Sequence, residues 1–432
     1  MLCAPMVRRG APGREHLHFP RLGGLWRHAD FLRLWTGQTI SQFGSQITLL
    51  ALPLTAVLLL KASPLEMGIL NAIEMAPFLI IGLPAGVWVD RLPRRPVLIL
   101  GDFGRALALA TIPAAYLLGL LTMAQLYAVA AVTGTLTVFF DVAYMSYLPA
   151  LVNREQLVEG NSKMEVTRAA AQIAGPGMAG TLVDLLAAPL AIALDAVSFV
   201  VSSVFVLFVR ATEPRVAADG PRANMRAEMG EGLRWVLGNP LLRAIAGCTA
   251  SSNFFSNGVY AMYVLFAVRE LGLTPGEIGF IFAVGNLGFL AGAFLAAPLA
   301  RTLGLGRAIV GSQILGIMGW ILVPLAMPET ATVLLIASGV IMGLTTPVYN
   351  INQVSLRQAI TPDRLQGRMN ATMRFMVWGT MPLGSLLGGA LGQALGLRPA
   401  LWLMCIGGSL PFLWVLLSPV RSLREQPAPA EA

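Results

Sequence analysis

The sequence predicts an all-α membrane protein with twelve transmembrane helices arranged as two six-helix pseudo-repeats. Hydrophobic residues make up 56% of its 432 residues and charged residues only 12%, which is about half of the charged share of a soluble domain. The other two observations behind this prediction are a mean hydropathy of +0.70 and the recurrence of short patterns at half the chain length.

The repeats indicate which segments of the two halves correspond. Ser63-Pro-Leu-Glu-Met-Gly68 reappears 211 residues later as Thr274-Pro-Gly-Glu-Ile-Gly279. Two equivalent bundles that rock around a shared site are typical of membrane transporters. Four further residues recur 209 positions later with the same identity: Asn161, Met164, Gly175 and Gly180 match Asn370, Met373, Gly384 and Gly389.

Apolar runs long enough to span a bilayer, about 20 residues each, occur in two sets of six, and a polar stretch separates the sets. We expect a short amphipathic helix at 224–237 within this stretch. The expected spans are 34–60, 66–88, 97–119, 123–147, 164–184 and 187–209, then 241–267, 275–298, 307–326, 331–354, 372–396 and 399–418. The expected domains are a tail at 1–30, a six-helix bundle at 31–210, a linker at 211–240, a second bundle at 241–418 and a tail at 419–432.

Helix N-caps mark the start of one span in each half. Ser63 and Thr274 are each followed by proline and, three residues on, by glutamate. This is the sequence pattern of a capping box with proline at the first helical position. The second and eighth spans are therefore predicted to begin there.

The distribution of basic residues predicts the orientation of the spans. With both termini in the cytoplasm, only Lys61, Arg269 and Arg398 of the 30 lysines and arginines fall in outer loops. This asymmetry follows the positive-inside rule. It predicts a multi-pass protein of the bacterial cytoplasmic membrane with both termini on the cytoplasmic side.

Several function classes find no support in the sequence. The net charge of +8 comes from arginines scattered at helix ends, so we expect no nucleic-acid partner. The chain has no Gly-x-x-x-x-Gly-Lys-Ser/Thr loop for a nucleotide, and its isolated cysteines lack the spacing of metal ligands. We therefore expect no enzyme, no cofactor and no metal. No histidine lies in the expected bundles, because all three belong to the N-terminal tail: His16, His18 and His28.

The loop after the second span reads Gly82-Leu-Pro-Ala-Gly86-Val-Trp-Val-Asp90-Arg91-Leu-Pro-Arg94-Arg95. It resembles the signature loop of the major facilitator superfamily, Gly-x-x-x-Asp-Arg-x-x-Arg-Arg, which lies at the same place between spans two and three. The alternative is a tight turn whose arginines hold the loop at the cytoplasmic face. The resemblance implies the major facilitator fold and a latch of the outward-open state formed by Gly86, Asp90, Arg91, Arg94 and Arg95.

The fifth span contains Ala174-Gly175-Pro176-Gly177-Met178-Ala179-Gly180. It is similar to the Gly-Pro-x-x-Gly-Gly element of the export branch of this superfamily, although alanine replaces one of the glycines. Gly175, Pro176 and Gly180 are predicted to form this export-type element. The alternative is ordinary close packing of a glycine-rich helix.

Residues 139–149, FFDVAYMSYLP, and the Gly-Asn-Ser at 160–162 resemble a bacterial subgroup that contains macrolide-efflux-like proteins and enterobactin exporters. This resemblance covers nearly the whole chain, residues 30–418, and implies export. Proton-coupled drug antiporters of the superfamily often carry an arginine inside span four, but residues 126–140 contain none. Export is therefore better supported than proton antiport.

Acidic residues inside the spans need an explanation, because a charge at the centre of a span costs roughly 2.5–3.5 kcal/mol. Glu74 is the first candidate for a carboxyl group that binds and releases a proton, or else it hydrogen-bonds a neighbouring helix. Asp195 is a second deep acid. Asp141 is a further candidate, although an ion pair with Arg168 or Arg105 is the preferred interpretation. Three-residue spacing also predicts the pairs Asp102–Arg105 and Glu165–Arg168.

The resemblance further implies that spans one, four, seven and ten line a central cavity. Hydrogen bonds between helices, worth about 0.6 kcal/mol each on average, explain polar residues in these spans equally well. A cavity rich in aromatic rings and neutral amides suits a bulky, mainly apolar ligand. The candidates for substrate contacts are Gln38, Gln42, Tyr144, Asn253, Asn257, Tyr349, Asn350 and Gln353.

Together these observations predict a monomeric secondary transporter that exports amphipathic or hydrophobic compounds, such as drugs or secondary metabolites, by alternating access and proton antiport. The expected partners are the small-molecule substrate, protons and the lipid bilayer. Two alternatives stay open. One is an exporter or importer of siderophores or other metabolites, and the other is a transport-inactive membrane sensor.

Overall fold

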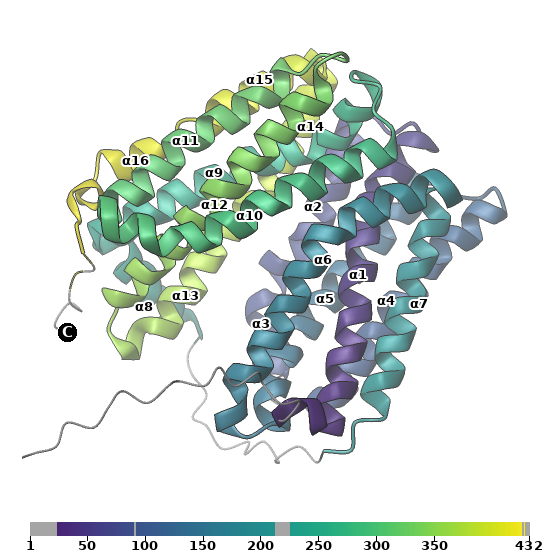
Figure 1. The fold of residues 1–432 in the computed structure, drawn as a ribbon, viewed down its shortest axis with the longest axis horizontal. Helices are drawn as coiled ribbons and strands as arrows, with labels where there is room; N and C mark the ends of the chain where they lie inside the picture. The colour runs from purple at the N-terminus through teal and green to yellow at the C-terminus, as the bar shows by residue number, and fades with distance from the viewer. Residues whose placement is uncertain (1–23, 90–91, 212–224, 426, 428–432) are drawn as a thin grey trace, which may run out of the picture.

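The computed structural model describes residues 24–89, 92–211, 225–425 and 427, and every regular element in this part of the chain is a helix (Figure 1). The first half contains η1 (Gly24–Arg27), α1 (Ala29–Leu58), α2 (Pro64–Ile80), α3 (Gly82–Val89), α4 (Arg94–Leu117), α5 (Met123–Leu151), η2 (Arg154–Gln156), α6 (Leu157–Leu186) and α7 (Ala188–Leu207).

The second half begins after the linker helix α8 (Met225–Gly238), which confirms the amphipathic helix expected at 224–237. It contains α9 (Pro240–Arg269), α10 (Pro275–Leu303), α11 (Leu305–Leu325), α12 (Ala331–Ala359), α13 (Asp363–Trp378), α14 (Thr380–Leu395), α15 (Leu397–Gly408), α16 (Phe412–Leu416) and η3 (Pro419–Ser422).

Each expected span contains a helix or two consecutive helices. In the described part of the chain, nine helical segments are long and apolar enough to cross a membrane. The segments of the second, fifth and seventh expected spans fall short of that criterion: these are α2 with α3, α6 and α9. The count of twelve spans depends on including these three, and it stays a prediction.

Three of the expected spans contain a short interruption of the helix. The segment 66–88 is interrupted at Ile81, three residues before Pro84, which cannot donate a backbone hydrogen bond to the carbonyl of Ile80. The segment 399–418 is interrupted between α15 and α16, where Pro411 precedes the new helix. The segment 372–396 is interrupted at Gly379, and its first helix, α13, already starts in a polar stretch that packs against α8.

The two predicted capping boxes are present. The Ser63 hydroxyl accepts from the backbone N–H of Glu66, and the Glu66 carboxylate accepts from the backbone N–H of Ser63 at 2.7 Å. Thr274 and Glu277 make the equivalent pair of hydrogen bonds at the start of α10. The repeat therefore marks structurally equivalent helix starts in the two halves.

The two halves meet at one end and diverge toward the other (Figure 1). We call the end where α1 starts, α7 ends and α9 starts the linker end, and the opposite end the distal end. Most of the contacts between the halves are formed by α2 with α14 and by α6 with α10, and α9 also contacts α1 and α2. A Cβ atom added at Gly68 would lie 2.9 Å from the Cα of Gly389, and one added at Gly279 would lie 3.0 Å from the Cα of Gly180. These glycines let the backbones of the two halves touch near the distal end.

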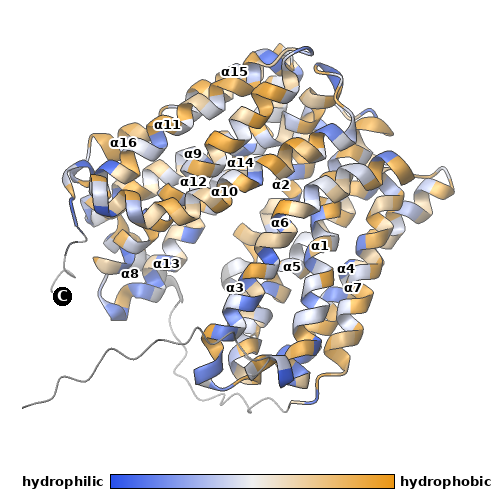
Figure 2. Ribbon diagram, viewed as in Figure 1, coloured by the Kyte–Doolittle hydropathy of each residue, from blue (hydrophilic) through white to orange (hydrophobic). Residues whose placement is uncertain are grey.

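The surface is apolar along most of the helix length. Many large hydrophobic side chains are exposed, including Leu117 and Phe294, each 73% exposed. Figure 2 shows hydrophobic residues along the outer faces of the helices and hydrophilic residues gathered at the linker end. This distribution is the one expected of helices surrounded by lipid.

Candidate functional site

A cavity of about 520 Å³ lies between the two halves, adjacent to their contacts at the distal end. Its wall comes from α1, α2 and α6 of the first half and from α9, α10, α11 and α12 of the second. A movement of one half against the other would therefore change the shape of this cavity. Its hydrogen-bonding and aromatic lining consists of Gln46, Asn71, Glu74, Asn257, Tyr260, Tyr263, Phe282, Asn286, Phe289, Trp320, Ser338 and Thr346.

Glu74 is the one charged residue on this wall among the residues that the structure describes. It projects from α2 one helical turn after Asn71 and is half-buried. No described residue forms an ion pair or a side-chain hydrogen bond with its carboxylate. A carboxylate without a fixed partner in an apolar wall is available to bind a proton or a cationic group of a ligand.

Aromatic rings form the opposite wall. Tyr263 and Phe282 lie with ring centroids 5.2 Å apart, and Tyr260 and Trp320 contact edge to face at 6.3 Å. They project from α9, α10 and α11 of the second half, across from Glu74 on the first half. Flat apolar surfaces of this size suit a bulky ligand and also attract cations through their π faces.

Two amide side chains of the wall, those of Asn71 and Asn286, are held by helices of the opposite half. Ser385 Oγ on α14 donates to Asn71 Oδ1 at 2.7 Å, which connects the two halves directly. Asn286 on α10 donates to the carbonyl of Gln172 on α6, which also crosses between the halves. These two hydrogen bonds depend on the present arrangement of the halves, so a change of conformation would break both.

Charged groups reinforce the contact at the distal end. Asp184 near the end of α6 accepts a hydrogen bond from the backbone N–H of Gly276 in the first turn of α10, at 2.9 Å. Arg269 at the end of α9 donates to the carbonyl of Ala62, before α2, at 2.8 Å. A carboxylate at a helix N-terminus is favourable because it pairs with free N–H groups and the positive end of the helix dipole.

The structure brings few of the predicted cavity residues to this wall. Asn257 lines it, and its amide donates to the Asn253 carbonyl at 2.9 Å. Tyr349 is buried within the second half and bonds the Thr249 hydroxyl at 2.7 Å, whereas Asn350 is exposed. The remaining candidates lie off this wall, either buried (Gln38, Gln353) or partly buried (Gln42, Tyr144, Asn253).

The other candidate acids also lie away from the cavity. Asp195 is buried within the first half, where the Ser198 hydroxyl donates to its carboxylate at 2.9 Å. Asp141 is exposed, and the ion pair expected for it is not formed with any described residue. The two arginines proposed as its partners have nearer acids instead. The structure confirms the pairs Asp102–Arg105, which is buried, and Glu165–Arg168, which is 3.8 Å long and exposed.

The buried pair is further enclosed by aromatic rings. The Arg105 guanidinium lies 4.3 Å from the ring centroid of Phe140 and 4.2 Å from that of Phe199. Arg105 is therefore held in place between two rings and an acid three residues before it on the same helix. Because Arg105 is held there, it does not form an ion pair with Asp141.

The signature loop is described only in part. Asp90 and Arg91 lie outside the described residues, and Gly86 belongs to α3. Arg94 is the first residue of α4, and the Arg95 side chain donates to the carbonyls of Val206 and Leu207 at the end of α7, at 3.3 and 2.6 Å. A cation at a helix C-terminus is favourable because the last carbonyl groups lack partners within the helix. Arg95 thus fastens the start of α4 to the end of α7.

The glycine-rich element of span five lies at the boundary between the halves. Pro176 lines the cavity. Gly180 faces α10, where an added Cβ would lie 2.4 Å from the carbonyl oxygen of Pro275, and Gly175 faces the side chain of Gln46 on α1. The element therefore brings α6 close to one helix of each half.

Sequence reasoning missed Asn71 and Asn286 as cavity residues. Gln46, by contrast, continues the four-residue spacing of Gln38 and Gln42 along α1, so the sequence carried a signal for it. Asn71 and Asn286 are amides in apolar helices, and the cost argument that identifies Glu74 applies to them more weakly. Within the described residues, no three His, Cys, Asp or Glu side chains come together as a possible metal site.

The cavity between two similar halves agrees with comparisons to known proteins. A family model described as transmembrane secretion effector matches residues 24–431. The multidrug efflux pump Tap of Mycolicibacterium fortuitum is 28% identical over 369 residues, which cover 82% of this chain and 87% of the relative. The macrolide efflux protein A of Streptococcus pyogenes is 23% identical over 401 residues, which cover 91% and 96%.

A solved structure shows the same fold. The crystal structure of a bacterial homologue of the iron transporter ferroportin, in an inward-facing state, superposes with a TM-score of 0.71 at 16% identity. The match covers 90% of this chain and 98% of that one. The fold is therefore that of the major facilitator superfamily.

Proposed function

Because the chain belongs to the transmembrane secretion effector family of the major facilitator superfamily, we propose that it exports bulky amphipathic or hydrophobic compounds by alternating access, in exchange for protons. The observation that carries this proposal is the cavity between the halves, where one carboxylate, Glu74, faces a wall of aromatic rings and amides. The efflux pumps among the relatives support export as the direction.

The proposed location is the bacterial cytoplasmic membrane, with both termini in the cytoplasm. The excess of arginines toward the linker end supports this orientation, since cytoplasmic loops carry most basic residues. The contacts at the distal end then close the cavity to the outside, and the diverging helices open it to the cytoplasm. A compound would enter from the cytoplasm, and a rocking movement of bundles 31–210 and 241–418 around the cavity between them would release it outside.

Glu74 is the residue that would couple the export of the compound to the entry of protons. Its carboxylate would hold either a proton or the cationic group of a substrate, and because both compete for one site, binding of the compound would displace the proton. Asp195 and Asp141 are the second choices as proton sites, since neither lines the cavity. The cavity lies within one chain, so a monomer suffices for this mechanism.

The test is proton release from inverted vesicles. Vesicles that contain the protein and an internal pH-sensitive dye are energised, and then lipophilic cations, macrolides and an anionic siderophore are added. Cations and macrolides should release protons with the wild type, and Glu74→Gln should abolish the release while Glu329→Gln, an exposed acid between α11 and α12, should not. Proton release by Glu74→Gln equal to that of the wild type would exclude Glu74 as the coupling site. Release by the siderophore alone would contradict the proposed substrate class.

A further inference from the structure

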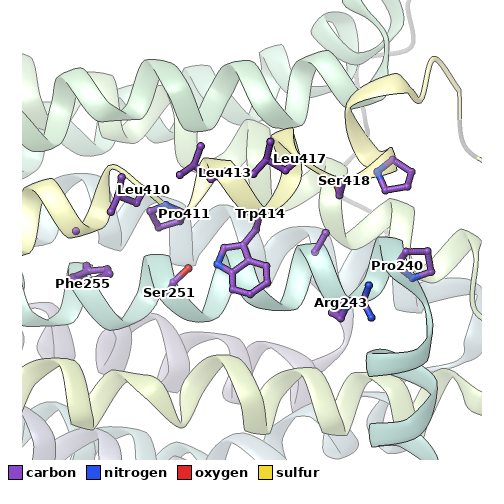
Figure 3. A pocket seen from close by; sticks show the side chains of 13 residues that line it. Pro240, Arg243, Ser251, Phe255, Leu410, Pro411, Leu413, Trp414, Leu417 and Ser418 are labelled. Atoms are coloured by element: carbon purple, nitrogen blue, oxygen red, sulfur yellow. The ribbon is translucent and has the colours of Figure 1, made fainter.

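A second cavity lies on the other side of α9, away from the cavity between the halves. It is a groove of about 600 Å³ between α9 and the interrupted last span, and Figure 3 shows its lining. The interruption between α15 and α16 creates it, because the chain turns between Gly408 and Phe412. The lining consists of Pro240, Arg243, Ala244, Ser251 and Phe255 on α9 and of Gly407, Leu410, Pro411, Leu413, Trp414, Leu417, Ser418 and Pro419 at the interruption and beyond it.

Close contacts through glycine define the walls of this groove. A Cβ atom added at Gly407 would lie 2.2 Å from the ring of Phe255, and one added at Gly247 would lie 2.6 Å from the indole of Trp414. Helix α9 therefore touches α15 through Phe255 and α16 through Gly247, and the groove lies beside these contacts. Trp414 is 52% exposed and Leu417 77% exposed, so the groove opens to the surroundings of the protein and not to its interior.

The two ends of the groove differ in chemistry. Phe255 and Leu410 lie at one end, and Arg243 lies at the other, near Pro240 and Ser418, with Trp414 between them (Figure 3). Twelve residues of α9 separate Arg243 from Phe255, which corresponds to about 18 Å along the helix axis. This length is close to half of the roughly 30 Å hydrocarbon core of a bilayer.

No acid in the described part of the chain neutralises Arg243. Its guanidinium is exposed and donates one long hydrogen bond, 3.4 Å, to the carbonyl of Leu237. The two serine hydroxyls of the groove have partners, since Ser251 donates to the Gly247 carbonyl and Ser418 to the Val415 carbonyl. The groove thus combines an apolar channel with one unpaired cation near the start of a helix.

We propose that this groove binds one anionic phospholipid, whose phosphate pairs with Arg243 and whose acyl chain lies along Trp414 toward Phe255. The charge at one end of the groove and the length of its apolar part both fit such a lipid. A single unpaired cation at the level where α9 starts matches a headgroup at the membrane surface, and an apolar channel of half a bilayer matches one acyl chain. The lipid would hold the short helix α16 against α9.

The test is lipid binding to the purified full-length protein, measured by native mass spectrometry with phosphatidylglycerol and phosphatidylcholine. The wild type should bind phosphatidylglycerol more tightly. Arg243→Gln should weaken that binding about five-fold, since one basic residue near an anionic surface contributes about 1 kcal/mol, and it should leave phosphatidylcholine unaffected. Arg243→Lys should keep the preference, and Arg301→Gln, an exposed arginine near the end of α10, should change nothing.

A second variant tests whether an acyl chain lies in the apolar part of the groove. Ser251→Phe fills the groove beside Trp414 and should weaken the binding of both lipids, with Arg243 unchanged. Size-exclusion profiles equal to that of the wild type show that the variants are folded. Equal binding of phosphatidylglycerol by wild type and Arg243→Gln would overturn the proposal, as would competition by inorganic phosphate alone. Lipid binding that appears only after removal of residues 426–432 would also overturn it, in favour of the chain's own C-terminal end as the occupant.

Discussion

At the scale of single residues, a glycine at the contact between the halves is as important as the acid in the cavity, because it has no side chain. Gly180 lies against the backbone of α10, where Pro275, Gly276 and Gly279 all lie within 3.1 Å of a Cβ atom added to it. Backbone atoms cannot move aside as the end of a flexible side chain can. The closure of the distal end therefore depends on this position being glycine.

We expect Gly180→Ala to lower the stability of the protein by about 1–3 kcal/mol, which is the usual cost of an overpacked contact. Gly177→Ala is the matched control, because the same change three residues earlier on α6 meets only the Cβ of Ala283 at 3.6 Å, an ordinary contact. Thermal unfolding of both variants in detergent measures the difference. Equal melting temperatures for the two variants would show that the contact between α6 and α10 is not tight.

The cavity could be predicted from the sequence at some residues and not at others. The sequence singles out Glu74 as a candidate for proton coupling, because a charge inside an apolar span has a large cost, and the structure places this residue on the cavity wall. Gln38 and Gln353 were proposed for the cavity, but the structure buries both in the helix packing. An amide in a span can either line the cavity or hydrogen-bond a neighbouring helix. Helical spacing predicts on which face of its own helix a side chain lies, but it does not predict what that face contacts. The cross-half hydrogen bond between Asn71 and Ser385 depends on the arrangement of the halves, which no local pattern encodes.

At the scale of helices, the capping boxes and the linker helix follow from local chemistry, whereas the interruptions do not. Ser63 and Thr274 cap their helices through residues three positions away, so the sequence contains the whole motif. The break between α15 and α16 involves Pro411, but prolines also lie inside α1, α4, α10 and α12 without ending them. Neighbouring helices decide whether a proline bends or ends a membrane helix.

The docking of α8 onto α13 offers a prediction at this scale. A Cβ atom added at Gly232 would lie 2.4 Å from Thr372 Oγ1 and 2.8 Å from the carbonyl oxygen of Arg368, whereas one added at Gly230 would meet nothing within 4 Å. Both changes to alanine gain about 1 kcal/mol of helix propensity. We expect Gly232→Ala nevertheless to raise amide hydrogen exchange in α8, because the helix is pushed away from α13.

Gly230→Ala is the control, and exchange in α8 should fall or stay the same with it. Glu231, which pairs with both Arg364 and Arg368 of α13, is a weaker determinant, since exposed ion pairs contribute at most about 1 kcal/mol. Loss of exchange protection with Gly230→Ala as large as with Gly232→Ala would mean that close packing does not hold α8 in place.

At the scale of the whole molecule, the two halves are connected by contacts that lie near the distal end and include glycine pairs, two amide hydrogen bonds and two charged groups at helix ends. The closest approaches between the halves are made by glycines and single hydrogen bonds, and buried apolar residues of both halves, such as Met67 and Met262, belong to one hydrophobic cluster. Such a contact can form and break during a transport cycle, and its loss at one end requires a new contact at the other.

We therefore expect opposite distance changes at the two ends of the molecule. Spin labels on cysteines at exposed Glu155 and Asp363 report on the linker end, and labels at exposed Lys61 and Glu329 report on the distal end. Lowering the pH should protonate acids such as Glu74 and change the balance between the two arrangements. Double electron–electron resonance should then show that the linker-end distance shortens wherever the distal-end distance lengthens. Glu74→Gln, which mimics the protonated acid, should show one fixed distribution at all pH values. Distances that change in the same direction at both ends would contradict a rocking movement, because they would mean that the halves separate as a whole.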